Sequence, residues 1–236
     1  MPRPVPNPTR RFLLSSLACG CAMAGGLHSA RAADAAHGPH TDLSADQALE
    51  LLRRGNEDFV NDRPAQAPIN RQRRLEIAKG QTPFAVLVGC SDSRVAPEVL
   101  FGRGLGELFI VRVAGNSVDR TALGSIEYGV AELRCPLVVV LGHERCGAVL
   151  AAVKAVTEDA TFPGAIGEMV APVIPAVLRA QRMEGDLVAN SVKENVRRVV
   201  RRLREADDIL SDPVQKGQVK IVGAYYSLTD GSVLFL

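Results

Sequence analysis

The sequence predicts an α/β fold: a mostly parallel sheet of about four strands plus an antiparallel edge strand, flanked by helices, with an N-terminal helical arm. Residues 84–89 and 137–141 are continuous apolar runs, which is typical of parallel strands buried on both faces. Segments with helical spacing separate the apolar runs, and this alternation favours a parallel sheet. A turn at 228–232 joins two strand-like segments near the end of the chain and predicts an antiparallel return.

The folded part of the chain is expected to begin with an amphipathic helix that Ser44 caps at its N-terminus. Leucine, phenylalanine and valine side chains at helical spacing supply its apolar face as far as Asn61. Residues 64–70 are expected to be extended, and residues 71–79 are expected to form a short helix. These elements precede the sheet and form the N-terminal helical arm.

The remaining elements follow from the apolar pattern. Parallel strands are expected at residues 84–89, 108–113, 137–141 and 219–225, and the edge strand at 233–235. Helices are expected at residues 121–133, 146–156 and 186–210. The last of these is predicted as one long helix, because valine and leucine residues mark one side of it. Prolines between 163 and 175 punctuate the segment before it without excluding short helices.

The first 32 residues (1–32) have the composition of an export signal. They carry four arginines and no acidic residue, and an uncharged apolar stretch fills positions 12–27. Arg10 and Arg11 directly before this stretch resemble a twin-arginine signal, which carries folded proteins across a bacterial inner membrane, so a periplasmic location is expected. An ordinary secretory signal is the alternative. The residues before Cys19 and Cys21 disfavour lipidation there.

Residues 33–43 are expected to form a flexible arm, and residues 44–236 a single domain of ordinary size. His37 and His40 lie in the arm and are assigned no ligand role. Removal of the export signal takes away four of the 28 basic residues and none of the 26 acidic ones, so the net charge changes from +2 to −2. Neither charge indicates a nucleic-acid partner, and no stable membrane association is expected once the signal is removed.

Three residues of the domain predict a zinc site. Cys90, His143 and Cys146 offer two thiolates and one imidazole, which are donors that zinc prefers in tetrahedral coordination. Three protein ligands leave one position free, as in catalytic rather than structural sites. A disulfide between Cys90 and Cys146 is the alternative. Cys135, the other cysteine of the domain, is expected to be a small core residue.

The predicted strands explain how these ligands meet. Cys90 directly follows the apolar run at 84–89, and His143 follows the run at 137–141. In an open α/β sheet, ligands bind at the carboxyl ends of the strands, so these two side chains are expected to converge there. Cys146 is expected at the start of the next helix, where the helix N-terminus would lower the pKa of its thiol.

Five segments resemble, in the same order, those of the β-class carbonic anhydrases: CSDSRV at 90–95, RVAGN at 112–116, SIEY at 125–128, GHERCGA at 142–148 and VGAY at 222–225. The resemblance covers residues 44–236. It implies one zinc ion per chain, held by Cys90, His143 and Cys146. It also implies the reversible hydration of carbon dioxide to bicarbonate and a proton, through attack by zinc-bound hydroxide.

The resemblance also implies that Asp92 and Arg94 form a carboxylate–guanidinium dyad. Physical reasoning agrees, because the rigid fork of donors on Arg94 can hold Asp92 off the metal. Asp92 could then accept the proton of the zinc-bound hydroxide and orient it toward the substrate. Without this restraint, Asp92 is a possible fourth ligand that would close the site.

Carbon dioxide is small and apolar, so it needs an apolar pocket beside the metal. The resemblance implies that this pocket is built across a dimer interface, and a homodimer or a higher homo-oligomer is therefore expected. Phe109, Val113 and Tyr128 match the pocket positions, and Gln81 matches an amide that hydrogen-bonds substrate or water. A plain role in the strand core is the alternative for Phe109 and Val113.

Two other functions remain open at this point. Relatives of the implied fold hydrolyse carbonyl sulfide or carbon disulfide at a similar zinc site, and their selectivity depends on access to the pocket rather than on the ligands. A non-catalytic zinc-binding module is the second alternative. The dyad beside an incomplete ligand set argues against it, since a structural zinc site normally closes with a fourth protein ligand.

Overall fold

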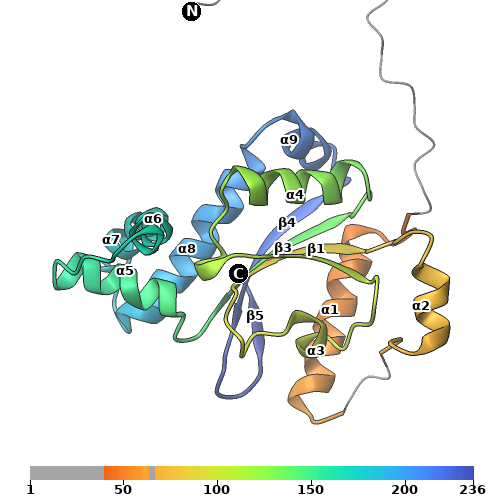
Figure 1. The fold of residues 1–236 in the computed structure, drawn as a ribbon, viewed down its shortest axis with the longest axis horizontal. Coiled ribbons are helices and arrows are strands. Elements are labelled where there is room, and N and C mark those ends of the chain that lie inside the picture. The colour runs from red at the N-terminus through yellow and green to blue at the C-terminus, as the bar shows by residue number, and fades with distance from the viewer. Residues whose placement is uncertain (1–39, 64–66) are drawn as a thin grey trace, which may run out of the picture. The chain divides into compact units, whose positions relative to one another are not determined.

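The computed structural model describes residues 40–63 and 67–236. The predicted export signal, residues 1–32, and most of the predicted arm lie outside the described residues. The described part confirms the predicted fold class, because a mostly parallel sheet with one antiparallel edge strand is flanked by helices (Figure 1).

One five-stranded sheet forms the centre, with strand order β2-β1-β3-β4-β5. All neighbouring pairs are parallel except β4 and β5. The strands are β1 (Ala85–Gly89), β2 (Leu108–Arg112), β3 (Leu137–His143), β4 (Lys220–Tyr226) and β5 (Val233–Phe235). The chain passes from β1 to β2 on one side and then to β3 on the other side of β1. Ligands bind at such a reversal of strand order in open α/β sheets.

The apolar runs became the two central strands because helices cover both faces of the sheet. Every residue of β1 and β3 is buried. Alternate side chains enter two separate cores, so that Val86 and Val138 belong to one cluster and Leu87 and Val139 to the other. Continuous hydrophobic sequence is what a strand buried on both faces requires.

Helices on the two faces come from different parts of the chain (Figure 1). The core that includes Val86 lies between the sheet and the helices α4 (Arg120–Ala131), α8 (Leu187–Arg204) and α9 (Asp208–Gln215). The core that includes Leu87 receives α1 (Ala45–Val60) and α3 (Pro97–Leu100). The short helix α2 (Arg71–Ile77) precedes β1. In the part of the chain that the structure describes, none of the helices is both long and apolar enough to cross a membrane.

A third cluster lies at the carboxyl end of β1 and β3. It combines Cys90 and Cys146 with apolar residues of α5 (Gly147–Thr157), α6 (Ala165–Val170) and α7 (Ile174–Ala180). Two single-turn helices, η1 (Ala114–Asn116) and η2 (Ala171–Val173), also pack against α5. These helices therefore cover the sheet edge at which the predicted ligands lie.

The prediction of one continuous helix over residues 186–210 is wrong near its end. α8 ends at Arg204, and α9 begins a new helix at Asp208. Asp207 separates the two helices. Its carboxylate accepts hydrogen bonds from the N–H groups of Ile209 and Leu210 and so caps the N-terminus of α9. At the other end of the domain, Ser44 caps α1 as predicted, in a reciprocal capping box with Gln47.

Candidate metal centre

Cys90, His143 and Cys146 meet at the carboxyl ends of two neighbouring strands. Cys90 is the residue after β1, His143 is the last residue of β3, and Cys146 directly precedes α5. The ligand atoms of the three side chains all lie within 4.8 Å of one another, and all three residues are buried. The structure thus brings together the three predicted ligands.

The imidazole of His143 has one nitrogen engaged and one free. Its Nδ1 lies 2.9 Å from the carbonyl oxygen of Glu144, so Nδ1 carries the proton and donates it. Its Nε2 is buried and has no hydrogen-bond partner among the described residues. A buried nitrogen lone pair without a partner is costly unless it binds something, and metal-ligating histidines show this arrangement.

The two thiols lie close together but are not joined. Cys90 Sγ is 3.9 Å from Cys146 Sγ, well beyond the length of a disulfide bond, and both cysteines are free. The neighbouring Cys146 thiol, His143 and the Gly115 amide together lower the pKa of Cys90 to about 4, although burial opposes them. The pKa of Cys146 is raised instead, because this thiol holds the proton shared with Cys90 and is buried. The N–H groups of Ala148 and Val149 at the start of α5 act to lower the pKa of Cys146, as predicted, but the shared proton and burial outweigh them.

This donor set fits a zinc ion. Two sulfurs and one imidazole nitrogen suit a borderline-soft divalent cation, which would replace the proton that the thiols share. In the part of the chain that the structure describes, the cluster contains these three donors and no fourth. A tetrahedral ion would keep one position for solvent or substrate.

Asp92 and Arg94 form the predicted pair beside this cluster. Arg94 Nε donates to Asp92 Oδ1 at 2.9 Å, and Arg94 Nη2 donates to Asp92 Oδ2 at 2.7 Å. The guanidinium holds the pKa of Asp92 well below its usual range. Asp92 Oδ2 lies 3.8 Å from His143 Nε2, which places the carboxylate at the edge of the ligand cluster.

Arg112 is a site residue for which no role was predicted. Its Nε donates to the carbonyl oxygen of Cys90 at 2.8 Å, and its Nη2 donates to that of Asp92 at 2.6 Å. The guanidinium of Arg112 thus holds in place the backbone of both Cys90, a ligand, and Asp92, the carboxylate of the dyad. The sequence pointed to Arg112 only through the segment RVAGN, which is part of the family resemblance.

Glu144 is a second residue whose role was missed. Its carbonyl accepts the His143 Nδ1 proton, and its own N–H donates to the carbonyl oxygen of Tyr226 at 2.8 Å. Its carboxylate accepts from Thr229 Oγ1 at 3.0 Å and from Ser227 Oγ at 3.4 Å. Hydrogen bonds from Thr229 lower the pKa of Glu144. The turn after β4 therefore anchors the carbonyl that orients the imidazole.

The four predicted pocket residues do not lie together in one place within the chain. Val113 lies near Cys90, because its N–H donates to the carbonyl oxygen of Gly89 at 3.0 Å. Phe109 and Tyr128 pack on each other, with 6.1 Å between ring centroids, and Tyr128 is 48% exposed. Phe109 and Val113 belong to the core cluster beside α4, whereas Cys90 and Cys146 belong to the cluster beside α5. Gln81 is exposed on the segment before β1.

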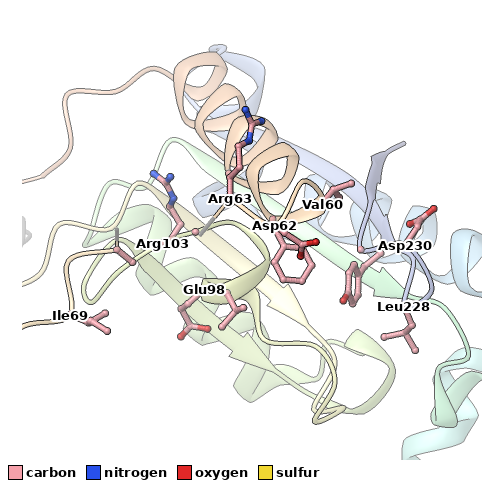
Figure 2. A pocket seen from close by; sticks show the side chains of 15 residues that line it. Val60, Asp62, Arg63, Ile69, Glu98, Arg103, Leu228 and Asp230 are labelled. Carbon is pink, nitrogen blue, oxygen red and sulfur yellow. The ribbon is translucent and has the colours of Figure 1, made fainter. Parts of the chain in front are cut away.

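A large groove lies elsewhere on the domain. It has a volume of about 800 Å³ and is formed by the end of α1, by α3 and by the turn after β4. Figure 2 shows charged lining residues such as Asp62, Arg103 and Asp230 together with the apolar side chains of Val60, Ile69 and Leu228. None of its lining residues belongs to the ligand cluster or to the dyad.

Comparison with known proteins identifies similar chains. A family model described as carbonic anhydrase matches residues 85–233. Carbonic anhydrase 2 of Mycobacterium tuberculosis is 43% identical over 194 residues, which are 82% of this chain and 92% of that protein. A carbonic anhydrase of Mycolicibacterium smegmatis is 39% identical over 186 residues, which are 79% of this chain and 90% of that one.

Solved structures share the fold. The Coccomyxa β-carbonic anhydrase in complex with acetazolamide is 25% identical, with a TM-score of 0.62 over 80% of this chain and 84% of that chain. A β-carbonic anhydrase from Sordaria macrospora, described as tetrameric, has a TM-score of 0.63 at 23% identity over 69% of this chain and 84% of that one.

Proposed function

Because this chain belongs to the β-class carbonic anhydrases and catalyses the reversible hydration of carbon dioxide to bicarbonate and a proton, we propose that Cys90, His143 and Cys146 hold the zinc ion for this reaction. The observation that carries the proposal is the buried, unpartnered Nε2 of His143 beside two free thiols. One zinc ion per chain accounts for all three donors.

A bound zinc ion supplies a Lewis acid that lowers the pKa of water from 15.7 to about 7 at a three-histidine carbonic anhydrase site, so that the nucleophile exists near neutral pH. Two thiolates donate more charge than two imidazoles. The pKa of water at this site is therefore expected to lie higher.

Asp92 and Arg94 control the open coordination position. Both carboxylate oxygens of Asp92 accept hydrogen bonds from Arg94, so the carboxylate is directed toward the guanidinium rather than into the ligand cluster. Asp92 Oδ2 is still close enough to the cluster to accept a hydrogen bond from the reacting water. The dyad thus orients the nucleophile while it keeps Asp92 from closing the site.

We also propose that the pocket for carbon dioxide is completed by a second copy of the chain in a homodimer or a higher homo-oligomer. The backbone of Val113 bonds to that of Gly89, the residue before Cys90, and we expect its partly buried side chain to supply an apolar wall from the same chain. The exposed ring of Tyr128, packed on Phe109, supplies an apolar surface for the site of the partner chain. Gln81 is also exposed, so its amide is free to reach that site. The tetrameric relative from Sordaria macrospora supports assembly of this kind.

Export to the periplasm by a twin-arginine route is proposed from residues 1–32. Folding and zinc loading before export would keep Cys90 and Cys146 from oxidising to a disulfide. Cell fractionation tests this: the parent chain is expected in the periplasm, and the double variant Arg10→Lys, Arg11→Lys is expected to remain in the cytoplasm. Equal export of both would contradict the route.

Stopped-flow measurement of carbon dioxide hydration, with the zinc content of the same sample, tests the function. We expect activity in proportion to zinc, loss of zinc in Cys90→Ser, and retained zinc with low activity in Asp92→Asn. Hydrolysis of carbonyl sulfide is measured in parallel. Activity that does not follow zinc content would contradict the proposal.

A further inference from the structure

The thiolate of Cys90 receives a hydrogen bond from another part of the backbone. The N–H of Gly115 lies 3.2 Å from Cys90 Sγ. Gly115 belongs to η1, which follows β2, whereas Cys90 follows β1. An N–H directed at a thiolate stabilises its negative charge and fixes the direction in which the sulfur offers its remaining lone pairs.

The turn that supplies this N–H places a non-glycine residue, Asn116, in an uncommon backbone conformation. Gly115 has φ of 67° and Asn116 has φ of 45°, both in the left-handed region. A Cβ at position 115 would lie 3.0 Å from the Cβ of Ala148 in α5, so the turn is also tightly packed. Such a conformation persists only where the surrounding structure holds it in place.

Asn195 holds this turn from the middle of α8. Its Nδ2 donates to the carbonyl oxygen of Gly115 at 2.8 Å, across 80 residues of sequence. Asn195 is only 3% exposed and is followed on the buried side of α8 by Val196 and Val199. A buried amide is unfavourable unless it makes such a hydrogen bond.

We propose that Asn195 is a positioning residue of the metal centre: by binding the Gly115 carbonyl, it fixes the turn whose N–H orients the Cys90 thiolate toward the zinc ion. This inference rests on the proposed zinc site. It extends that site to α8, a helix that contributes no ligand. The consequence is that zinc affinity depends on a side chain that never touches the metal.

The test compares zinc affinity, measured by competition with a chromophoric chelator, and the visible spectrum of the cobalt-substituted protein. Asn195→Ala removes the amide, and Asn195→Asp replaces it with a carboxylate of the same size that cannot donate. Both variants are expected to bind zinc about 10-fold to 100-fold more weakly, as found when groups that orient metal ligands are removed. The sulfur-to-cobalt charge-transfer band is expected to shift.

Ser191→Ala is the matched control, because Ser191 is also buried on α8 but its hydroxyl bonds only to the carbonyl of Leu187 in the same helix. It is expected to leave both measurements unchanged. If Asn195→Ala fails to fold, the isosteric Asn195→Asp decides. Parent-like affinity and spectrum in a folded Asn195 variant would overturn this inference alone. Failure of the parent chain to bind zinc would overturn the proposed zinc site as well.

Discussion

Both carboxylate oxygens of Asp92 accept hydrogen bonds from the guanidinium of Arg94, with Nε 2.9 Å from Oδ1 and Nη2 2.7 Å from Oδ2. The two residues are separated by one position in the chain, and the N–H of Arg94 also donates to Asp92 Oδ1 at 3.0 Å. Asp92 therefore has three donors from one residue, and this arrangement sets its direction beside the ligand cluster.

Replacement of Arg94 by glutamine should release Asp92. The freed carboxylate can then take the open coordination position, and the nucleophile loses its orienting group. We expect the turnover number for carbon dioxide hydration to fall on the order of 100-fold with zinc content retained. Arg63→Gln is the control, since Arg63 pairs with Asp58 at the end of α1, away from the metal centre. Parent-like turnover in Arg94→Gln would refute the role given to the dyad.

The three buried thiols should behave differently from one another. Burial raises the pKa of Cys135 to about 12, and its Sγ donates to the carbonyl oxygen of Pro83 at 3.3 Å. Cys135→Ser should therefore leave the zinc stoichiometry near one per chain, whereas Cys90→Ser and Cys146→Ser should each lower it. Metal analysis of the purified variants checks this. Loss of zinc in the Cys135 variant, or its retention in both others, would count against the ligand assignment.

Gly142 allows α8 to approach β3 directly before His143. A Cβ at this position would lie 2.6 Å from Val196 Cγ2 and 2.8 Å from Val192 Cγ1. Gly142→Ala should lower the free energy of unfolding by about 1–3 kcal/mol, because the helix must shift. Gly124→Ala, where a Cβ meets no atom within 4 Å, is the control and should be neutral or slightly stabilising. Urea denaturation distinguishes them, and equal stability of both variants would show that the packing is not tight.

The rate of carbon dioxide hydration should rise with pH. The reaction needs deprotonated water, and two thiolates on the metal raise the pKa of that water relative to a three-histidine site. Arg94 lowers the pKa of Asp92, so Asp92 remains ionised above pH 5. Its titration therefore does not change the rate within the measured pH range. A pH–rate profile from 6 to 9.5 checks this, and a rate that is flat or falls toward alkaline pH would be inconsistent with it.

Local signals predicted the strands and the convergence of the ligands. The apolar runs end directly before Cys90 and His143, so burial on both faces and the rule for strand ends placed both residues. The break between α8 and α9 was missed because the apolar spacing continues through it, whereas the cap at Asp207 interrupts the backbone. Arg112 was visible only as part of a motif.

Contacts between distant segments were not predictable in the same way. Asn195 and Gly115 are 80 residues apart, and Glu144 and Thr229 are 85 apart, so no local pattern links them. The one signal for Asn195 was an amide next to the valines that mark the buried side of α8. The pocket positions depend on a second chain, and the sequence of one chain does not specify how two copies meet.

X-ray absorption at the zinc edge of the active protein identifies the atoms bound to the metal. We expect two sulfur neighbours at about 2.3 Å and one imidazole nitrogen at about 2.0–2.1 Å, with a single light atom in the fourth position. The same spectrum of Cys146→Ser should show fewer sulfur neighbours, if zinc is retained at all. A zinc ion without sulfur neighbours, or one bound by four protein ligands in fully active material, would show that Cys90, His143 and Cys146 do not form an open zinc site.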